Sequence, residues 1–263
     1  MSSSDGRKSI FITGAASGMG RATAVLFAKS GWFVGGYDID KAGLVALSDE
    51  IGAQNGLFSA LDVTDAAAFE AAMAAFGQET GGTLDLMFNN AGIGSGGLLD
   101  EQPWDDLMRV VNINFIAVMI GVRAAIPLLK NTPGSLSLIN SSSSAIFGTA
   151  GIPVYSATKH AVRGLTEALS IELKRYGVRA SDLLPGLIDT PLLSDKMRAM
   201  APSEGEWRLV QPSEIAETVW KAYHGDKLHW YVPEELRAFH LRVVAEPEAV
   251  REERTALLAA MAE

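Results

Sequence analysis

Tyr155 and Lys159 are four residues apart near the start of a predicted helix, Val154–Tyr176. Residues with this spacing project from the same helical face about one turn apart, so the phenol and the ammonium can lie close together. A free tyrosine has a pKa of about 10, and a nearby ammonium favours the phenolate; lowering the pKa by about three units takes about 4 kcal/mol. The pair could then transfer a proton near neutral pH. The same spacing also arises by chance, as an exposed aromatic beside a solvated lysine.

Ser142 stands at the end of a predicted strand, Ser135–Ser141, thirteen residues before Tyr155. Sheet topology can bring its hydroxyl beside the phenol, where it could donate a hydrogen bond to a developing alkoxide. Ser141–Ser144 are all serine, so Ser143 remains the alternative. The run also resembles a polar strand end whose hydroxyls cap turns.

A glycine-rich loop, Thr13–Gly20, joins the predicted strand Ser9–Thr13 to the predicted helix Met19–Ser30. Gly14 permits a tight turn, Gly18 lets backbone N–H groups approach a pyrophosphate, and Gly20 allows close packing of helix on strand. The loop therefore predicts a dinucleotide site. Its candidate residues are Gly14, Ser17, Gly18, Met19 and Gly20.

Asp38 ends the predicted strand Trp32–Asp38, twenty positions after Gly18. A carboxylate there can accept hydrogen bonds from the adenosine ribose and repels a 2′-phosphate. Ser17 and Ile39 add no positive charge, so the pattern predicts NAD rather than NADP. The alternative is that Asp38 only caps a turn before Asp40.

Short apolar runs alternate with longer helical patterns along the chain. Strands buried on both faces have this composition, which predicts one doubly wound α/β domain of the Rossmann type over residues 1–263, with about seven parallel strands. The expected strands are Ser9–Thr13, Trp32–Asp38, Gly56–Asp62, Leu84–Asn90, Ser135–Ser141, Ala180–Pro185 and Leu228–Val232. The expected helices are Met19–Ser30, Thr64–Thr80 with a Thr cap, Trp104–Lys130, Val154–Tyr176 and one or two within the C-terminal tail, 234–263.

Ligands of such sheets bind at the carboxyl ends of the strands. The third strand ends at Asp62 and Val63, and the fourth ends in Asn89-Asn90-Ala91-Gly92. We therefore expect these residues to line the predicted cleft, although each of the two segments alone indicates only a loop.

Composition narrows the function classes further. The net charge of −9 argues against nucleic-acid binding, and the absence of cysteine excludes disulfides and thiolate ligands. The four histidines show no metal-binding spacing, and we expect no metal. With no signal-like N-terminus and no long uninterrupted apolar run, we expect a cytoplasmic protein without a membrane partner. The long helices are apolar on several sides, which favours a homo-oligomer, either a dimer or a tetramer.

Taken together, the motifs resemble the short-chain dehydrogenase/reductase family in its compact form, over nearly the whole chain. The resemblance rests on Thr13-Gly14-x-x-x-Gly18-x-Gly20, Asp62, Asn89-Asn90-Ala91-Gly92, Asn114, Ser142, Tyr155-x-x-x-Lys159 and Pro185-Gly186-x-Ile188-x-Thr190. The family's asparagine is placed at Asn114, with Asn112 as the alternative.

The resemblance implies hydride transfer between NAD(H) and a secondary alcohol or ketone, with Tyr155 exchanging the hydroxyl proton. It implies that Ser142 orients the substrate oxygen, that Lys159 binds the nicotinamide ribose, and that Asn114 holds a water linked to Lys159. Pro185, Gly186, Ile188 and Thr190 would surround the nicotinamide. Residues 191–207 would form a substrate lid whose leucines and methionines favour a bulky apolar substrate. The alternative function is a non-catalytic NAD-binding sensor on the same fold.

Overall fold

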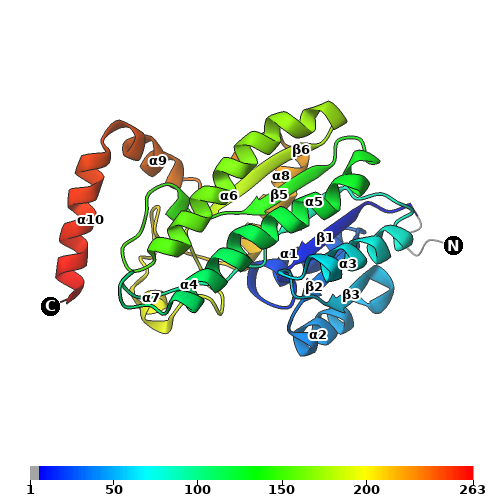
Figure 1. The fold of residues 1–263 in the computed structure, drawn as a ribbon, viewed down its shortest axis with the longest axis horizontal. Coiled ribbons are helices and arrows are strands. Elements are labelled where there is room, and N and C mark those ends of the chain that lie inside the picture. The colour runs from blue at the N-terminus through cyan, green and yellow to red at the C-terminus, as the bar shows by residue number, and fades with distance from the viewer. Residues whose placement is uncertain (1–5, 263) are drawn as a thin grey trace.

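The strands form a seven-stranded parallel sheet in the order β3-β2-β1-β4-β5-β6-β9. A computed structural model describes the backbone of residues 6–262 and the side chains of residues 6–259; the outermost residues of the predicted domain and tail, 1–5 and 263, lie outside the described part. The strand order reverses between β1 and β4, so their connections leave in opposite directions and open a crevice at the carboxyl edge. The predicted doubly wound parallel sheet is confirmed (Figure 1).

The strands are β1 (Ser9–Thr13), β2 (Phe33–Asp38), β3 (Gly56–Ala60), β4 (Leu86–Asn89), β5 (Leu136–Asn140), β6 (Arg179–Pro185) and β9 (His229–Val232), with a separate short pair, β7 (Leu187–Ile188) and β8 (Leu209–Val210). The helices are α1 (Gly18–Lys29), α2 (Lys41–Ile51), α3 (Ala66–Glu79), α4 (Trp104–Val111), α5 (Ala117–Lys130), α6 (Pro153–Glu172), α7 (Asp195–Met200), α8 (Pro212–His224), α9 (Leu236–Ala245) and α10 (Pro247–Ala262).

The sheet carries a hydrophobic layer on each face. Along β1, Ile10 and Ile12 point to the side covered by α1, α2 and α8, whereas Phe11 points to the side covered by α3, α5 and α6. Side chains of a strand alternate between faces, so a nearly continuous apolar run supplies both layers at once. This is why most strands were recognisable as short, nearly all apolar segments.

Several element boundaries differ from the predictions. The predicted helix Thr64–Thr80 begins at Ala66, and its N-cap is Asp65, whose carboxylate accepts a hydrogen bond from the Ala68 N–H at 3.0 Å. Thr64 instead donates through its hydroxyl to Asp62. Helices α2, α7 and α8 were not identified in the sequence. In α2, buried residues are spaced three apart, at Leu44 and Leu47, between exposed neighbours, which is a weak helical signal.

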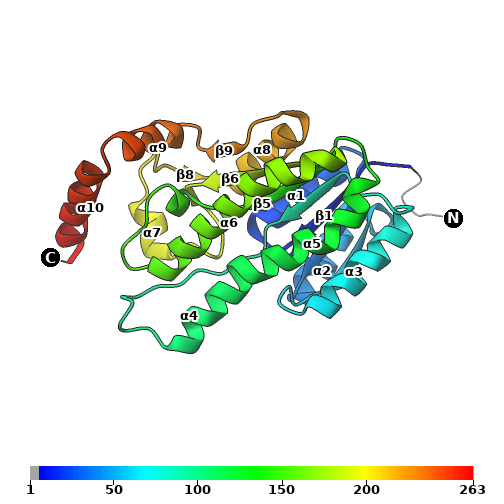
Figure 2. The same cartoon turned by 45° about the horizontal axis from the view of Figure 1, so that its top comes forward.

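The predicted helix Trp104–Lys130 is one long rod containing a π-helical turn, Asn112–Ile116, between α4 and α5 (Figure 2). By length and composition it is apolar enough to cross a membrane. However, Val118, Val122, Ala125 and Leu129 pack in the core against the sheet and α3, as expected of a core helix in a globular domain. The π turn moves the buried stripe of α5 relative to that of α4.

The C-terminal tail forms two helices, as the sequence predicted. Helix α9 packs its Leu236 and Phe239 into a small core with Ala145, Ile146 and Leu184. Helix α10 follows at Pro247, and Figures 1 and 2 both show it at the outer end of the molecule, joined to the body through α9.

Replacing Phe11 with Ala should destabilise the domain by about 3–5 kcal/mol, because it deletes a fully buried ring. The Phe11 ring stacks on Tyr37 at 4.1 Å and also contacts Phe69 and Phe76. The free energy of unfolding in urea measures the loss. Leu241→Ala, at an exposed position of α9, should change it by no more than about 0.5 kcal/mol. Equal losses in the two variants would contradict this account of the core.

Candidate active site

A cavity of about 1540 Å³ lies at the carboxyl edge of the sheet. Its walls come from the ends of the central strands, the start of α6, the lid and α10. It brings together fifteen of the predicted cofactor residues: Gly14, Ser17, Gly18, Met19, Asp38, Asp62, Val63, Ala91, Gly92, Tyr155, Lys159, Pro185, Gly186, Ile188 and Thr190. Gly20 and Asn89 are not among its lining residues.

The glycine loop has the backbone that its sequence predicted. Gly14 and Gly18 have φ angles of 69° and 51°, a region that L side chains avoid. A Cβ on Gly18 would lie 3.0 Å from the Thr190 methyl group, and one on Gly20 would collide with the Gly14 carbonyl oxygen. Gly20 therefore serves helix–strand packing, while Gly18 keeps the cavity open. Ser17, the N-cap of α1, makes no side-chain cap hydrogen bond. The first N–H groups of α1 are thus left for an anion, and the loop fits the diphosphate of a dinucleotide.

Asn90 connects the strand ends; the sequence placed it in the predicted cleft without assigning a role to its side chain. Its amide donates to the carbonyl oxygens of Thr13 and Gly14 at 2.9 and 3.2 Å, and its Oδ1 accepts from the Asn140 amide at 3.2 Å. The Asn90 and Ala91 N–H groups both donate to the Thr13 hydroxyl at 3.0 Å. The glycine loop is therefore held directly by the residues that follow β4 and, through Asn90, by β5. The double asparagine in the sequence was the available signal.

Asn89 was predicted to contact the cofactor, and the structure places it elsewhere. It is the last residue of β4 and is 3% exposed, and its Oδ1 occupies the space where a Cβ on Gly121 of α5 would lie. Successive strand residues point to opposite faces, so only one of the two asparagines can face the glycine loop, and that residue is Asn90.

Asp38 is half-buried at the end of β2 and lines the cavity. Its two carboxylate oxygens accept hydrogen bonds from the backbone N–H groups of Ala16 and Asp40, each at 3.0 Å. Asp38 therefore does cap the turn before Asp40, as the alternative interpretation proposed. A carboxylate has further lone pairs, so Asp38 is fixed in place and still able to accept from hydroxyl groups.

Asp62 lies at the cavity wall, with its Oδ1 accepting from both the backbone N–H and the hydroxyl of Thr64, at 2.9 and 2.7 Å. These two hydrogen bonds lower the pKa of the Asp62 carboxyl. The residue therefore holds the loop after β3 in shape as a charged acceptor.

Lys159 is 4% exposed, and its ammonium donates to the Asn140 carbonyl oxygen at 2.8 Å. Burial lowers the pKa of the Lys159 ammonium to about 8. Its Nζ lies 5.5 Å from the centre of the Tyr155 ring, so the helical spacing does bring the pair together.

The expected lowering of the Tyr155 pKa does not match the structure. Burial raises the pKa of the phenol, and a hydrogen bond with the Ser142 side chain acts in the opposite direction. The four-residue spacing accounts only for the attraction between the two charges, whereas burying the phenolate also costs free energy. Ser142 also accepts from the Ser144 N–H at 3.1 Å. The hydrogen bond to Tyr155 favours Ser142 over Ser143 as the serine beside the phenol.

Asn114 is fully buried in the π turn and lies beside Lys159. Its side-chain amide exchanges two hydrogen bonds, each of 2.9 Å, with the Ile93 N–H and carbonyl. A Cβ on Gly92 would lie 3.2 Å from Asn114 Oδ1 and 3.7 Å from Lys159 Nζ. Asn112 is exposed at the cavity wall, so the geometry favours Asn114. Because its amide is already bonded to Ile93, the side chain of Asn114 positions the loop after β4.

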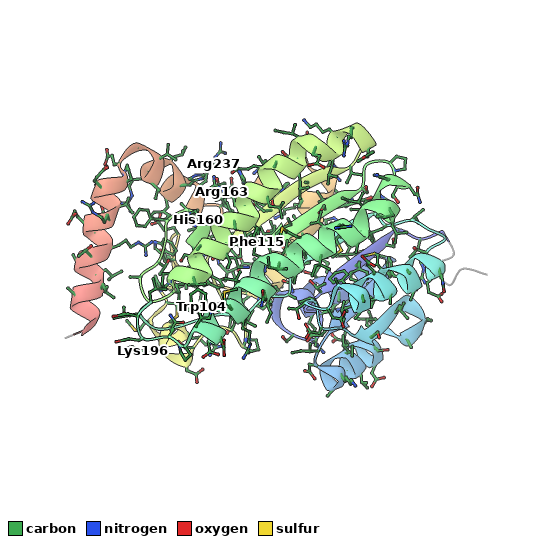
Figure 3. The ribbon with its side chains drawn as sticks, in the orientation of Figure 1. Trp104, Phe115, His160, Arg163, Lys196 and Arg237 are labelled. Carbon is green, nitrogen blue, oxygen red and sulfur yellow. The ribbon has the colours of Figure 1, made fainter. Side chains whose placement is uncertain are left out.

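The predicted lid contains α7, and its cations differ in role. Arg198 donates to the carboxylates of Asp189 and Asp195 at 2.7 and 2.6 Å and to the Thr190 carbonyl at 3.2 Å. It therefore anchors the lid to the strand end and is not free to meet a substrate. Lys196 is exposed on α7 (Figure 3). Gly94, Ser95, Thr149 and Ile152 also line the cavity, whereas Phe147 packs with the small core under α9.

The pH dependence of stability should report the burial of Lys159. Its pKa is about 8 in the folded state against a usual 10.5, so between these values the folded protein has lost a proton that the unfolded chain retains. The stability contributed by this site therefore rises with pH in that window. From about pH 7.5 to 9.5, the wild type should gain about 2 kcal/mol relative to Lys159→Met.

Urea unfolding of the two proteins at both pH values measures this difference. Lys196→Met, which removes an exposed lid ammonium, is the matched control and should show no such change. A difference between the wild type and Lys159→Met that does not vary with pH would contradict the burial argument.

Comparison with known proteins identifies the family to which this fold belongs. The profile of the family described as "short chain dehydrogenase" matches residues 8–201. Cyclohexanol dehydrogenase from Acinetobacter sp. (strain SE19) is 34% identical over 222 residues, which covers 83% of this chain and 88% of that protein.

Two solved structures show the same fold with nicotinamide cofactors. A short-chain dehydrogenase/reductase from Burkholderia phymatum in complex with NAD gives a TM-score of 0.83 at 26% identity, covering 95% of this chain and 96% of that chain. An alcohol dehydrogenase from the archaeon Thermococcus sibiricus, complexed with 5-hydroxy-NADP, gives 0.75 at 26% identity, covering 85% and 94%. The family match over residues 8–201 and the similarity to these relatives show that the chain belongs to the short-chain dehydrogenase/reductase family.

Proposed function

We propose that the protein interconverts a secondary alcohol and its ketone with NAD(H). The observation that carries this proposal is the convergence of Tyr155, Ser142 and Lys159 on the cavity that also contains the glycine loop and Asp38. The similarity to a cyclohexanol dehydrogenase supports a cyclic secondary alcohol as the substrate class.

The nicotinamide, when bound, accepts the hydride of the carbinol carbon in oxidation and supplies it in reduction. Tyr155 moves the proton: it donates its hydroxyl proton to the carbonyl oxygen of a ketone or takes the hydroxyl proton of an alcohol. Ser142, already hydrogen-bonded to the phenol, orients the same oxygen. Oxidation thus yields ketone, reduced cofactor and one proton.

Burial favours the protonated form of Tyr155. With a raised pKa, Tyr155 is protonated near neutral pH and ready to donate to a ketone. Lys159 stabilises the phenolate that remains, because its ammonium lies on the same helical face. We therefore expect alcohol oxidation to be favoured as the pH rises, since the phenol must first lose its proton.

The substrate end of the cavity is largely apolar. Leu192, Met197 and Met200 of the lid face it together with Ile152 and Trp207. The lid side chains are about half exposed, so they gain apolar contact when a bulky group enters. This composition supports a ring-sized substrate.

Cofactor choice follows from charge at the adenosine end. Asp38 presents a carboxylate, and its neighbours Ser17 and Ile39 add no positive charge. A 2′-phosphate would meet repulsion there without a cationic partner, so NAD is the proposed cofactor.

We also propose a homo-oligomer. Trp104 and Ile116 are exposed on the long helix, and Figure 3 labels Trp104 near its start. Trp104 is 72% exposed, and Ile171 of α6 is 76% exposed. Exposed apolar side chains of this size are typical of an interface. The cytoplasmic location stays a prediction.

Tyr155→Phe should abolish turnover while leaving cofactor binding intact, because only the proton-carrying oxygen is lost. NADH oxidation with a panel of cyclic ketones measures turnover, and calorimetric titration with NADH measures binding. Undiminished turnover in the variant would refute the proton-transfer role. NAD binding by the wild type without turnover across a broad panel would instead support the sensor alternative.

Asp38→Ala should lower the ratio of kcat/KM with NADH to that with NADPH about tenfold to a hundredfold, as expected for losing a charged hydrogen-bond acceptor. Asp40→Ala is the matched control: Asp40 caps α2 through the Gly43 N–H but does not line the cavity. Its ratio should equal that of the wild type. An unchanged ratio in Asp38→Ala would mean that Asp38 does not bind the ribose.

A further inference from the structure

Arg254 of α10 lines the same cavity as Tyr155. Its guanidinium lies in a corner formed by two aromatic rings, 4.6 Å from the ring centre of Trp207 and 5.1 Å from that of Phe239. The two rings meet edge to face at 5.2 Å and 75°. The C-terminal helices therefore bring a fixed cation to the substrate end of the site.

Two carboxylates near Arg254, those of Glu206 and Glu253, attract its charge but make their hydrogen bonds to other groups. Glu206 accepts from the Trp207 indole N–H at 2.9 Å, and Glu253 pairs with Arg242 at 3.1 Å. Among the residues whose side chains the structure describes, no hydrogen bond or ion pair is found for Arg254. Arg198 and Arg242, by contrast, are both paired. Arg254 is thus a half-buried guanidinium with unused donors, and its burial lowers the pKa of the group.

Stacking on aromatic rings leaves the hydrogen-bonding edge of a guanidinium open. The rings contact the guanidinium from two sides, and its N–H donors lie in the plane of the group. This edge matches the two oxygens of a carboxylate, which it binds through two parallel hydrogen bonds. A partly desolvated cation gains more from such a partner than a solvated one does. Glu253 also faces the cavity, but its charge is balanced by Arg242.

We propose that Arg254 binds a carboxylate of the substrate, so that the substrate is a cyclic hydroxy acid or keto acid. The reacting carbon lies at Tyr155, and the carboxylate extends towards α10. This inference rests on the proposed alcohol–ketone activity. It makes α10 part of the substrate site rather than a packing element alone.

The test compares two alcohols that differ only in the acid group, cyclohexanol and 4-hydroxycyclohexanecarboxylate. For each protein, the ratio of kcat/KM for the acid to that for cyclohexanol is measured with NAD. The wild type should favour the acid. In Arg254→Gln the ratio should fall about tenfold to a hundredfold, mainly through KM, because a charge-assisted hydrogen bond is lost.

Two further variants serve as controls for carboxylate binding by Arg254. Arg254→Lys keeps the charge but not the planar fork, so it should recover only part of the ratio. Arg251→Gln, on the same helix, removes an exposed guanidinium that pairs with Glu252 and does not line the cavity. It should behave as the wild type. An equal loss with both substrates in Arg254→Gln would leave the ratio unchanged and overturn the proposal, since it would show a packing role.

A binding measurement separates this inference from the proposed function. Cyclohexanecarboxylate, which has no hydroxyl group to oxidise, is titrated calorimetrically into each protein, with cyclohexanecarboxamide as the neutral counterpart. The acid should bind the wild type about tenfold or more tighter than it binds Arg254→Gln, while the amide should not distinguish them. Equal binding of the acid to both proteins would overturn the proposal. If the wild type oxidised neither alcohol, the proposed function would fail, and this titration would still decide the carboxylate site.

Discussion

The hydrogen-bond network of Thr13, Asn90 and Asn140 joins the ends of β1, β4 and β5, and the site depends on it. Asn90 holds the glycine loop through the carbonyls of Thr13 and Gly14 and is itself held by Asn140. The Asn140 carbonyl in turn accepts from Lys159. One connected set of buried groups thus fixes the dinucleotide loop relative to the catalytic helix. These hydrogen bonds connect buried polar groups in sequence, which makes such a network rigid.

Burial holds the side chains of the site in place but disfavours their charged forms. Lys159 has lost most of its contact with water, so its ammonium is easier to deprotonate than usual, and the Tyr155 phenolate is disfavoured for the same reason. If Tyr155 and Lys159 were exposed to water, their pKa values would be close to the usual ones, but their side chains would not be held in one position. This free-energy cost of burying charge accompanies a fixed geometry, which a group that transfers a proton needs in order to lie within hydrogen-bond reach of its substrate. Ser142 offsets part of it by hydrogen bonding to the phenol.

The opposite end of the cavity is built by segments that follow the sheet. Arg198 ties the lid to Asp189 and Asp195, and α9 docks through Leu236 and Phe239. The rings of Phe239 and Trp207 then contact the Arg254 guanidinium from two sides. The two ends of the cavity therefore come from different parts of the chain: the N-terminal strands form one end, and the lid and the last two helices form the other.

The sequence by itself determined the doubly wound sheet, its strand positions and the glycine loop, because these depend on local periodicity and on backbone angles that only glycine adopts readily. It also predicted the Tyr155–Lys159 pair, whose spacing is a property of one helix. Tertiary structure alone decided that Asn90 rather than Asn89 faces the loop, because one residue of register reverses the face. It decided the direction of the Tyr155 pKa, since burial depends on neighbours far away in the chain. It also decided that Arg254, about a hundred residues after Tyr155, shares a cavity with it, because no local pattern records where a terminal helix docks.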